Sequence, residues 1–331
     1  MSRAARPARL PSIDGGPSRG HSSRYHPRLV EAARAAVARL WPGRAAKVAE
    51  LGGGITNRNF KVEVGGEVFV LRMGGAKTHL LGIDRAVEYA AGKRAFEVGI
   101  GPEVTAFVPD QGWLVARFID GSPLSVAEMR QDEVLARVVR ALRAFHDSTP
   151  IPGRFDAWAV VDGYRTVAES HGVGIPAQFG GARRIAERIR SARGPQPLVP
   201  CHNDLLNANF LDDGAVQIVD WEYAGMGDRF FDLANFSVNH EFVVDDDRRL
   251  MRAYFGVERD TDLASLRLMR FMSDFREAMW GVLQSGISEL DFDFDAYATK
   301  HFARMMASAA DSDFERYLRA FSDGTRAAPE D

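Results

Sequence analysis

The sequence predicts an α+β protein with two lobes, a small β-rich lobe on the N-terminal side and a larger, mainly helical lobe after it. Segments that alternate between apolar and polar residues, as strands do, gather before residue 117. After Leu124 the apolar residues mostly recur at helical spacing. We therefore expect lobes at residues 26–116 and 117–325 of the 331-residue chain, which is long enough for two hydrophobic cores.

Composition and charge restrict the classes of protein to consider. The chain is 46% hydrophobic and 26% charged, which is typical of a soluble globular protein. The formal net charge of -3 argues against a general nucleic-acid binder, and no apolar run is long enough to span a bilayer. Cys201 is the only cysteine, so an internal disulfide is excluded and the cytoplasm is the expected location. The oligomeric state, monomer or homodimer, is left open.

The elements of the small lobe follow in order. Residues 1–25 are rich in Arg, Pro, Gly and Ser without the apolar core of a secretion signal, so we expect a disordered extension. A helix is predicted over 27–41, followed by strands in FKVEV and EVFVLRM with a hairpin turn at Gly65 and Gly66. LGIDRAVEYAAGKRAFEVG is predicted as a helix ending near Gly99, and PEVTAFVPDQGWLVARFIDG as a further strand pair.

The larger lobe begins with VAEMRQDEVLARVVRALRAFHDS, which predicts one long amphipathic helix over 126–148. Most later segments are helical in pattern, apart from short strands around HNDLLNAN at 202–209. That polar stretch has two interpretations. It is either a turn held by side-chain-to-backbone hydrogen bonds or a catalytic loop.

HNDLLNAN matches H-x-D-x-x-x-x-N, the pattern of the kinase catalytic loop. Phosphoryl transfer from ATP needs an alcohol oriented toward the terminal phosphate, and the carboxylate of Asp204 can accept its proton. It also needs Mg²⁺, which the side-chain oxygen of Asn209 can hold. Asp220 follows an apolar strand sixteen positions after Asp204, where kinases place a metal-binding aspartate. Each residue alone is typical of a turn, but the combination favours a kinase.

A glycine-rich corner, LGGGITNRNFKV, lies between two segments of the small lobe. The backbone of Gly53 and Gly54, together with Thr56 and Asn57, could approach phosphates because glycine has no side chain to obstruct them. A tight turn is the simpler interpretation of the glycines alone. No G-K-[ST] follows, so the corner is not a Walker loop.

A strand arginine and a helix glutamate form a candidate charge pair. Kinases hold the ATP phosphates with a strand lysine that a helix glutamate positions. Arg72 and Glu88 can take these roles, because a guanidinium offers a planar fork of donors to phosphate oxygens. The alternative is an ordinary surface pair of little energetic weight. The order of this pair relative to the 202–220 motifs favours the kinase role.

Together these stretches resemble the choline/ethanolamine kinases, within the wider group of aminoglycoside-phosphotransferase-like small-molecule kinases. HNDLLNAN and DWEYAGMGDRFFDLANF are specific to the wider group, whereas REAMWGVLQSGISELDFDFDAYA indicates the choline/ethanolamine branch. The resemblance covers residues 51–304. It implies a bilobal protein-kinase-like fold with ATP in the cleft and adenine facing the linker, where Arg117 and Ile119 lie.

The resemblance also implies roles for the motif residues. Asp204 is implied as the base, and Asn209 and Asp220 as Mg²⁺ ligands. Glu222 is implied as a further acidic group at the metals. His202 is expected to orient the loop rather than to transfer a proton.

The expected acceptor is a small cationic alcohol, choline or ethanolamine first, with its hydroxyl at Asp204. The family pattern implies an aromatic cage around its headgroup, formed by Tyr223, Trp280, Phe292 and Tyr297. Aromatic faces attract such cations through their quadrupoles. Core packing is the alternative, because burial is the default for aromatic side chains in an apolar helical context.

Two positions depart from the eukaryotic choline kinase pattern. Glu277 stands where those proteins have an additional tryptophan, and Asn239 replaces an acidic residue. A carboxylate can accept a hydrogen bond from a primary ammonium but not from a quaternary one. Glu277, as a further acceptor-site residue, therefore puts a preference for choline over ethanolamine in doubt. The alternative is that Glu277 pairs with Arg276 or another basic residue.

Two other functions stay open. An aminoglycoside kinase on the same fold would use an acid-lined pocket, for which SELDFDFD is a candidate. A nucleotide-binding pseudokinase that acts through partner contact is disfavoured, because Asp204, Asn209 and Asp220 are all present. Protein substrates are not expected, because no long segment ending in A-P-E follows Asp220.

Overall fold

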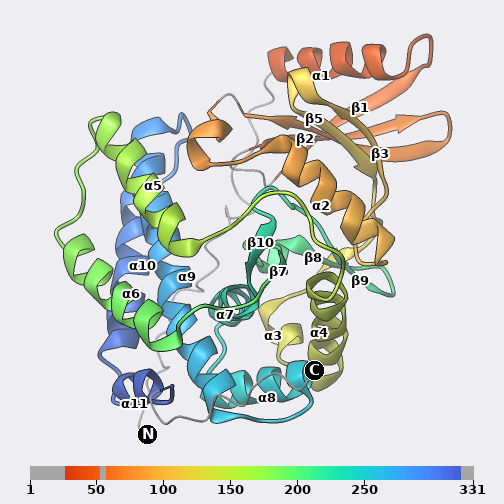
Figure 1. Cartoon of the computed structure of the whole chain (residues 1–331). Coiled ribbons are helices and arrows are strands. Elements are labelled where there is room, and N and C mark those ends of the chain that lie inside the picture. Colours follow the sequence, from red (N-terminus) through yellow and green to blue (C-terminus); the bar gives the residue numbers. More distant parts are fainter. Residues whose placement is uncertain (1–26, 53–56, 76, 322–331) are drawn as a thin grey trace, which may run out of the picture.

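A computed structural model describes residues 27–52, 57–75 and 77–321 of the chain. Figure 1 shows the small sheet lobe beside a larger lobe made mainly of helices. The predicted α+β, two-lobed fold is therefore confirmed. The extension at 1–25 lies outside the described residues, as does the end of the larger lobe after residue 321.

The small lobe is built on one antiparallel sheet in the order β1-β2-β3-β5-β4. Its strands are β1 (Ala46–Leu51), β2 (Asn57–Val64), β3 (Glu67–Gly74), β4 (Val104–Val108) and β5 (Trp113–Arg117). The hairpin turn between β2 and β3 is confirmed. Gly65 and Gly66 have φ angles of 62° and 83°, a region that glycine enters without steric cost.

Helices cover both faces of this sheet. The predicted first helix, α1 (Pro27–Leu40), packs Val30, Ala33 and Val37 against the buried side chains of β2 and β3. The other covering helix is α2 (Arg85–Glu97), which follows η1 (Thr78–Leu81). It begins later than predicted because the Asp84 side chain accepts the N–H groups of Ala86 and Val87.

The helix predicted over 126–148 is wrong as a single element. The chain forms α3 (Val126–Met129) and α4 (Asp132–His146) instead. Ser125 and Glu128 form a capping box, which starts a helix at this point. The acidic first turn of α4 provides a second start six residues later, so two local helix starts interrupt the amphipathic pattern.

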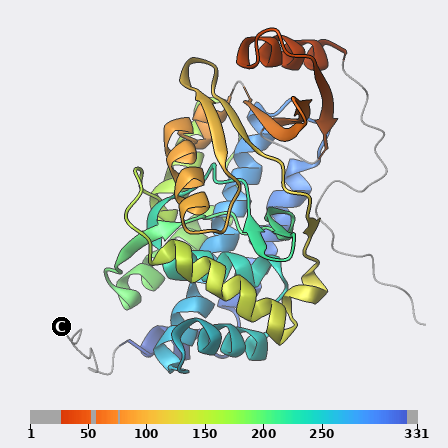
Figure 2. The same cartoon turned by 90° about the vertical axis from the view of Figure 1, so that its right-hand side faces the viewer.

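Most of the larger lobe packs around α9 (Asp260–Ile287), which is buried along most of its length. Figure 2 shows α1 at the far end of the small lobe and α4 lying across the larger lobe. The remaining helices are α5 (Ala157–Ser170), α6 (Phe179–Arg193), α7 (Arg229–Asn239), α8 (Val244–Phe255), α10 (Phe294–Ala309) and α11 (Phe314–Arg319).

Short strands carry the polar motifs. β7 (Leu198–Cys201) leads directly into residues 202–209 and pairs with β10 (Gly225–Asp228). β6 (Ser122–Pro123), β8 (Phe210–Asp212) and β9 (Val216–Ile218) form a separate three-stranded sheet, with η3 (Asn207–Asn209) before β8. η2 (Pro109–Gln111) connects β4 to β5. The short strands expected around HNDLLNAN are confirmed.

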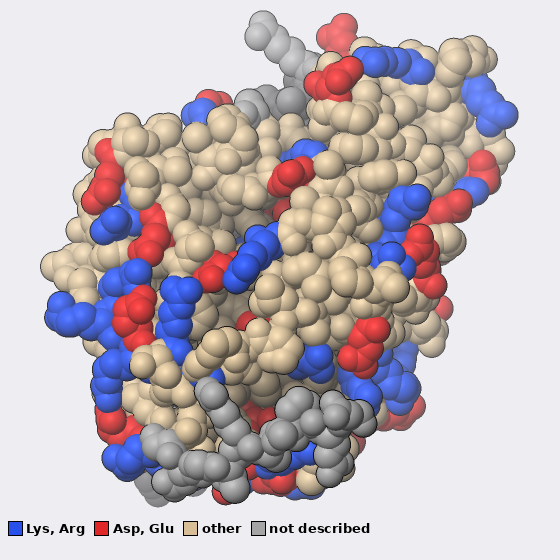
Figure 3. Space-filling view, in the orientation of Figure 1, with Lys and Arg blue, Asp and Glu red and all other residues tan. Residues whose placement is uncertain are grey.

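The surface carries both signs of charge. Figure 3 shows Lys and Arg side chains interspersed with Asp and Glu over the face in view. Within the described ranges, no helix combines the length and the apolar character needed to cross a bilayer.

Gly281 permits the close packing of α9 and α10. A Cβ atom at this position would lie 3.0 Å from Cδ1 of Tyr297 and 3.2 Å from the backbone nitrogen of Ala298. We expect Gly281→Ala to lower the free energy of unfolding by about 1–3 kcal/mol, because the two helices must move apart. Urea denaturation measures this change.

Gly163→Ala in α5 is the matched control. Apart from the adjacent residues and the backbone of its own helix, no atom of the described residues lies within 4 Å of its added Cβ, so the alanine should stabilise the helix by about 0.5–1 kcal/mol. Equal effects of the two substitutions would contradict the packing role of Gly281.

Candidate active site

Arg72 joins the two lobes at the site. From β3, its Nη1 atom donates to Oε1 of Glu88 on α2 at 2.5 Å and to Oδ1 of Asp220 at 2.8 Å. The structure therefore brings together three residues that the sequence singled out from distant segments. Although burial opposes its charge, the carboxylates of Asp220 and Glu88 raise the pKa of Arg72.

Arg85 extends this network and was missed in the sequence. Its guanidinium contacts Glu88 at 2.5 Å, Glu222 at 3.3 Å and the side-chain oxygen of Asn57 at 2.7 Å. Asn57 in turn donates to Oε2 of Glu222 at 2.8 Å. The only signal was its position one turn before Glu88 on a predicted helix, which is common for surface pairs.

Asp204 lies at the start of the motif loop, largely buried. Its Oδ1 atom accepts a hydrogen bond from Nη1 of Arg276 at 3.2 Å. Burial raises the pKa of Asp204 to about 7; Arg276 opposes this rise, and Glu277 adds to it. A carboxylate with a pKa near neutrality is suited to accept a proton from an alcohol.

Asn209 and Asp220 supply the oxygens that could hold a metal. Nδ2 of Asn209 donates to the backbone oxygen of Asp204 at 2.9 Å, while its side-chain oxygen accepts no hydrogen bond within the described chain. Asp220 has a φ angle of 70° and keeps part of its carboxylate exposed. Oxygen donors of this kind fit Mg²⁺. The Oε2 atom of Glu222, the third candidate ligand, is engaged by Asn57 and Arg85.

Asp232 on α7 shapes the loop and was not predicted. Its carboxylate accepts the backbone N–H groups of His202 at 2.7 Å and Asn203 at 2.6 Å. Asn203 has a φ angle of 67°, and this left-handed conformation turns the loop. One helical turn later, Asn235 accepts the N–H of Leu205 at 2.6 Å. Helix α7 therefore fixes the backbone on both sides of Asp204.

The ring of His202 contacts two backbone groups, as expected for a residue that orients the loop. Its Nδ1 atom accepts the N–H of Asp204 at 3.2 Å, and its Nε2 atom donates to the backbone oxygen of Val219 at 3.0 Å. Burial lowers the pKa of His202 and favours the neutral ring. The histidine thus ties the loop to the segment that leads to Asp220.

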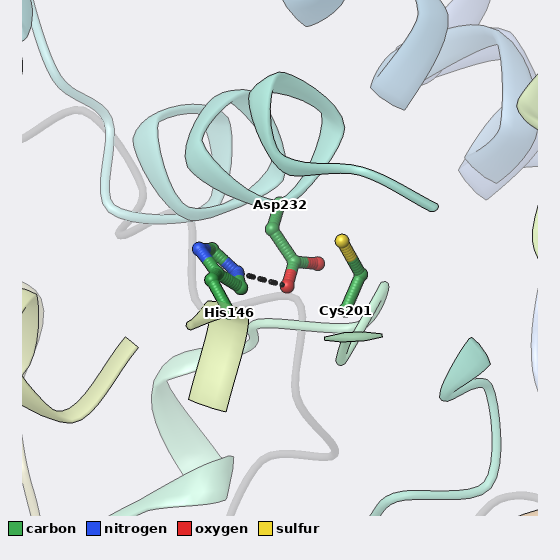
Figure 4. Close-up of side chains that lie close together, drawn as sticks. All are labelled: His146, Cys201 and Asp232. Carbon is green, nitrogen blue, oxygen red and sulfur yellow. Dashed lines mark hydrogen bonds and ion pairs between the residues drawn. The ribbon is translucent and has the colours of Figure 1, made fainter. Parts of the chain in front are cut away.

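Behind the loop, His146, Cys201 and Asp232 form a buried cluster with the composition of a metal site (Figure 4). Its polar atoms are engaged in hydrogen bonds. Nε2 of His146 contacts Asp232 at 3.0 Å and Nδ1 contacts the Tyr254 hydroxyl at 2.6 Å, while Asp232 holds the loop. Burial raises the pKa of the Cys201 thiol, so it stays protonated and is a poor ligand. The cluster is a structural support of the loop.

The four predicted cage aromatics lie together in the larger lobe. Trp280 donates from Nε1 to the Tyr223 hydroxyl at 3.0 Å, and its ring lies 5.5 Å from that of Tyr297 in a T-shaped arrangement. The Phe292 and Tyr297 ring centroids are 6.0 Å apart. Their roles toward an acceptor stay predictions.

A buried ion pair lies among these rings. Arg276 pairs with Glu277, and its guanidinium carbon lies 4.3 Å from the centre of the Tyr223 ring. The Tyr297 hydroxyl donates to Oε2 of Glu277 at 2.7 Å. Burial alone would raise the pKa of Glu277, but Arg276 and the hydrogen bond from Tyr297 lower it. Glu277 is therefore charged.

The other predicted nucleotide contacts are placed as follows. Gly53, Gly54 and Thr56 lie outside the described residues. The Arg117 side chain is partly exposed and pairs with Glu67 at 2.5 Å and Glu103 at 3.4 Å. Its backbone N–H donates to the Glu103 oxygen at 2.8 Å, and its role toward adenine stays a prediction. Ile119 is half-buried in the linker after β5.

Comparison with known proteins places this site in a family. The model of the phosphotransferase enzyme family matches residues 47–269, which is most of the chain. The chain belongs to the phosphotransferase enzyme family. This assignment confirms the predicted enzyme class.

Individual relatives agree with this assignment. A choline/ethanolamine kinase family protein from Mesorhizobium loti is 36% identical, with a TM-score of 0.75 over 88% of this chain and 98% of that one. Protein LicA of Haemophilus influenzae is 29% identical over 55% of this chain, and human ethanolamine kinase 1 is 26% identical over 75%. The chain spans 55% and 64% of these two curated relatives. The resemblance to choline/ethanolamine kinases is confirmed.

Asp232→Asn tests the support of the loop. The substitution keeps the size of the side chain but turns one oxygen into an NH₂ group that faces a backbone N–H. We expect the free energy of unfolding to fall by about 1–3 kcal/mol, because a buried donor loses its partner. Urea denaturation and hydrogen exchange at Asn203 measure the change.

The exposed Asp245→Asn serves as control and should change stability by less than about 0.5 kcal/mol. A loop that exchanges no faster in Asp232→Asn would contradict the role of Asp232 as the anchor.

Proposed function

We propose that the protein transfers the terminal phosphate of ATP to the hydroxyl group of a small amino alcohol of the choline/ethanolamine class. The observation that supports this most is the environment of Asp204. Asn209 contacts its backbone oxygen, Asp220 is a neighbouring carboxylate, and Arg276, which lies over the Tyr223 ring, contacts its Oδ1 atom. A base, a phosphate site and a headgroup site are the parts that this reaction requires.

The acceptor hydroxyl would bind to Asp204. Arg276 donates to Oδ1, whereas Oδ2 accepts no hydrogen bond from the described residues and can receive the hydroxyl proton. The oxygen of the alcohol then attacks the terminal phosphorus, and ADP leaves. Arg72, positioned by Glu88, would contact the phosphates as its planar fork allows.

Asn209 and Asp220 are the residues that would hold Mg²⁺. Glu222, the third candidate ligand, contacts Arg85 at 3.3 Å. When bound, the ion neutralises phosphate charge. Arg72 contacts Asp220 at 2.8 Å and so keeps this carboxylate oriented toward the phosphate side of the site.

The acidic run 288–295 gives little support to the aminoglycoside alternative. Asp293 accepts the N–H of Ala296 at 2.8 Å and so caps α10, and Glu289 pairs with Lys77 at 3.5 Å. These carboxylates are engaged in ordinary structural contacts. A pseudokinase would bind ATP without turnover on any acceptor.

Asp204→Asn tests the reaction directly. With Mg²⁺-ATP and ethanolamine, choline, methylated ethanolamines or aminoglycosides, ADP release should occur on an amino alcohol. The variant should lower kcat by about 10²–10⁴-fold, because an amide cannot accept the proton. Asp213→Asn, in the exposed turn between β8 and β9, should keep full activity. Turnover only on aminoglycosides, or none at all, would contradict the proposal.

Arg72→Met tests the phosphate contact. Loss of the guanidinium removes charge-assisted hydrogen bonds, so we expect KM for ATP to rise by at least about tenfold. Glu88 retains Arg85 as a partner, which should preserve the fold. Steady-state kinetics at saturating acceptor measure the effect. If KM and kcat both equal those of the unsubstituted protein, Arg72 does not bind phosphate.

A further inference from the structure

The acceptor site already contains a cation of its own. The Arg276 guanidinium lies 4.3 Å from the centre of the Tyr223 ring, and its side chain is 2% exposed. A cation binds an aromatic ring over its face, where the quadrupole is negative. This face of Tyr223 is therefore covered by the protein and is not available to a substrate headgroup.

Arg276 cannot leave this position without cost. Its Nη1 atom contacts both Asp204 and Glu277, so its departure would leave two carboxylates without their cation. Its Nε and Nη2 atoms are buried and make no hydrogen bond to the described chain. The guanidinium is held by the two carboxylates and the Tyr223 ring.

The charges of Asp204, Arg276 and Glu277 can be balanced by one small cation. Asp204 and Glu277 each contribute one negative charge when ionised, and Arg276 contributes one positive charge. With both carboxylates ionised, the three groups together carry one net negative charge, which a monocationic acceptor would balance. Glu277 receives hydrogen bonds from Arg276 on Oε1 and from Tyr297 on Oε2. A carboxylate offers about four lone-pair sites, so Glu277 can accept further N–H donors.

We propose that Arg276 and Glu277 make this site select a primary ammonium over a quaternary one. Glu277 accepts the N–H groups of the headgroup, while Arg276 covers the aromatic face that a trimethylammonium group would need. Arg276 is thus a specificity-determining residue that also orients Oδ1 of Asp204. This inference rests on the proposed function and deepens it.

A quaternary ammonium headgroup would form few contacts in such a site that offset the cost of desolvating Glu277. It carries no N–H donor, so its methyl groups would desolvate Glu277 without forming a hydrogen bond. The faces of the remaining rings are also partly used, because Trp280 packs in T-shaped contacts against Phe294 and Tyr297. Each added methyl group should therefore weaken binding.

The test measures kcat/KM for ethanolamine, its mono- and dimethyl derivatives and choline. In the unsubstituted protein, we expect kcat/KM to fall with each methyl group and by at least about tenfold from ethanolamine to choline. The double variant Arg276→Met with Glu277→Gln removes both charges together, so no buried charge is left unpaired within the pair. Its ratio of kcat/KM for ethanolamine to that for choline should fall by at least about tenfold.

Glu277→Gln alone gives a second readout if the double variant does not fold. It should raise KM for ethanolamine by about tenfold and KM for choline much less, because only ethanolamine also loses hydrogen bonds, and a purely structural role would not separate the two. Arg193→Met, which removes a buried arginine of α6 paired with Asp228, is the matched control and should keep the wild-type ratio.

Three outcomes can be distinguished. Equal or better use of choline by the unsubstituted protein would overturn the selection, and so would an unchanged ratio in a folded double variant. Turnover of neither alcohol would overturn the proposed function as well, and this inference with it.

Discussion

The loop that carries Asp204 depends on one buried carboxylate. Asp232 is fully buried, and its two oxygens accept two consecutive backbone N–H groups and the ring of His146. A buried charge is tolerated only when such donors replace water. Helix α7 holds this carboxylate in place, so the position of Asp204 is set by a helix that packs behind the loop.

Buried charged groups with protein partners also lie at the boundary between the two lobes. Arg72 and Arg85 come from the small lobe, and Asp220 and Glu222 from the larger one, with Glu88 shared by both arginines. The attraction within such buried ion pairs is largely offset by the cost of removing the charges from water, so they add little stability. They do require a specific geometry. The network therefore defines how the sheet meets the catalytic loop more than it adds to stability.

The sequence was informative where chemistry and spacing coincide. Asp204, Asn209 and Asp220 lie close along the chain, so their pattern could be recognised without knowing the fold. Asp232 lies in DWEYAGMGDRFFDLANF, a stretch typical of the wider family, but the sequence alone assigns this aspartate no partner. Its contact with His202 exists only after α7 packs behind the loop. Arg276 over Tyr223 likewise depends on tertiary packing. The error at 126–148 had a local cause, because a second helix start with an acidic first turn at Asp132 and Glu133 interrupts the amphipathic period.

The left-handed backbone conformation of Asp220 limits the residue types that this position can accommodate. At a φ angle of 70°, glycine, asparagine and aspartate are the residue types that avoid a steric penalty. Of these three, only aspartate is a carboxylate, and the longer glutamate would combine the right charge with a strained backbone. Backbone and side chain thus impose separate requirements that a single amino acid satisfies.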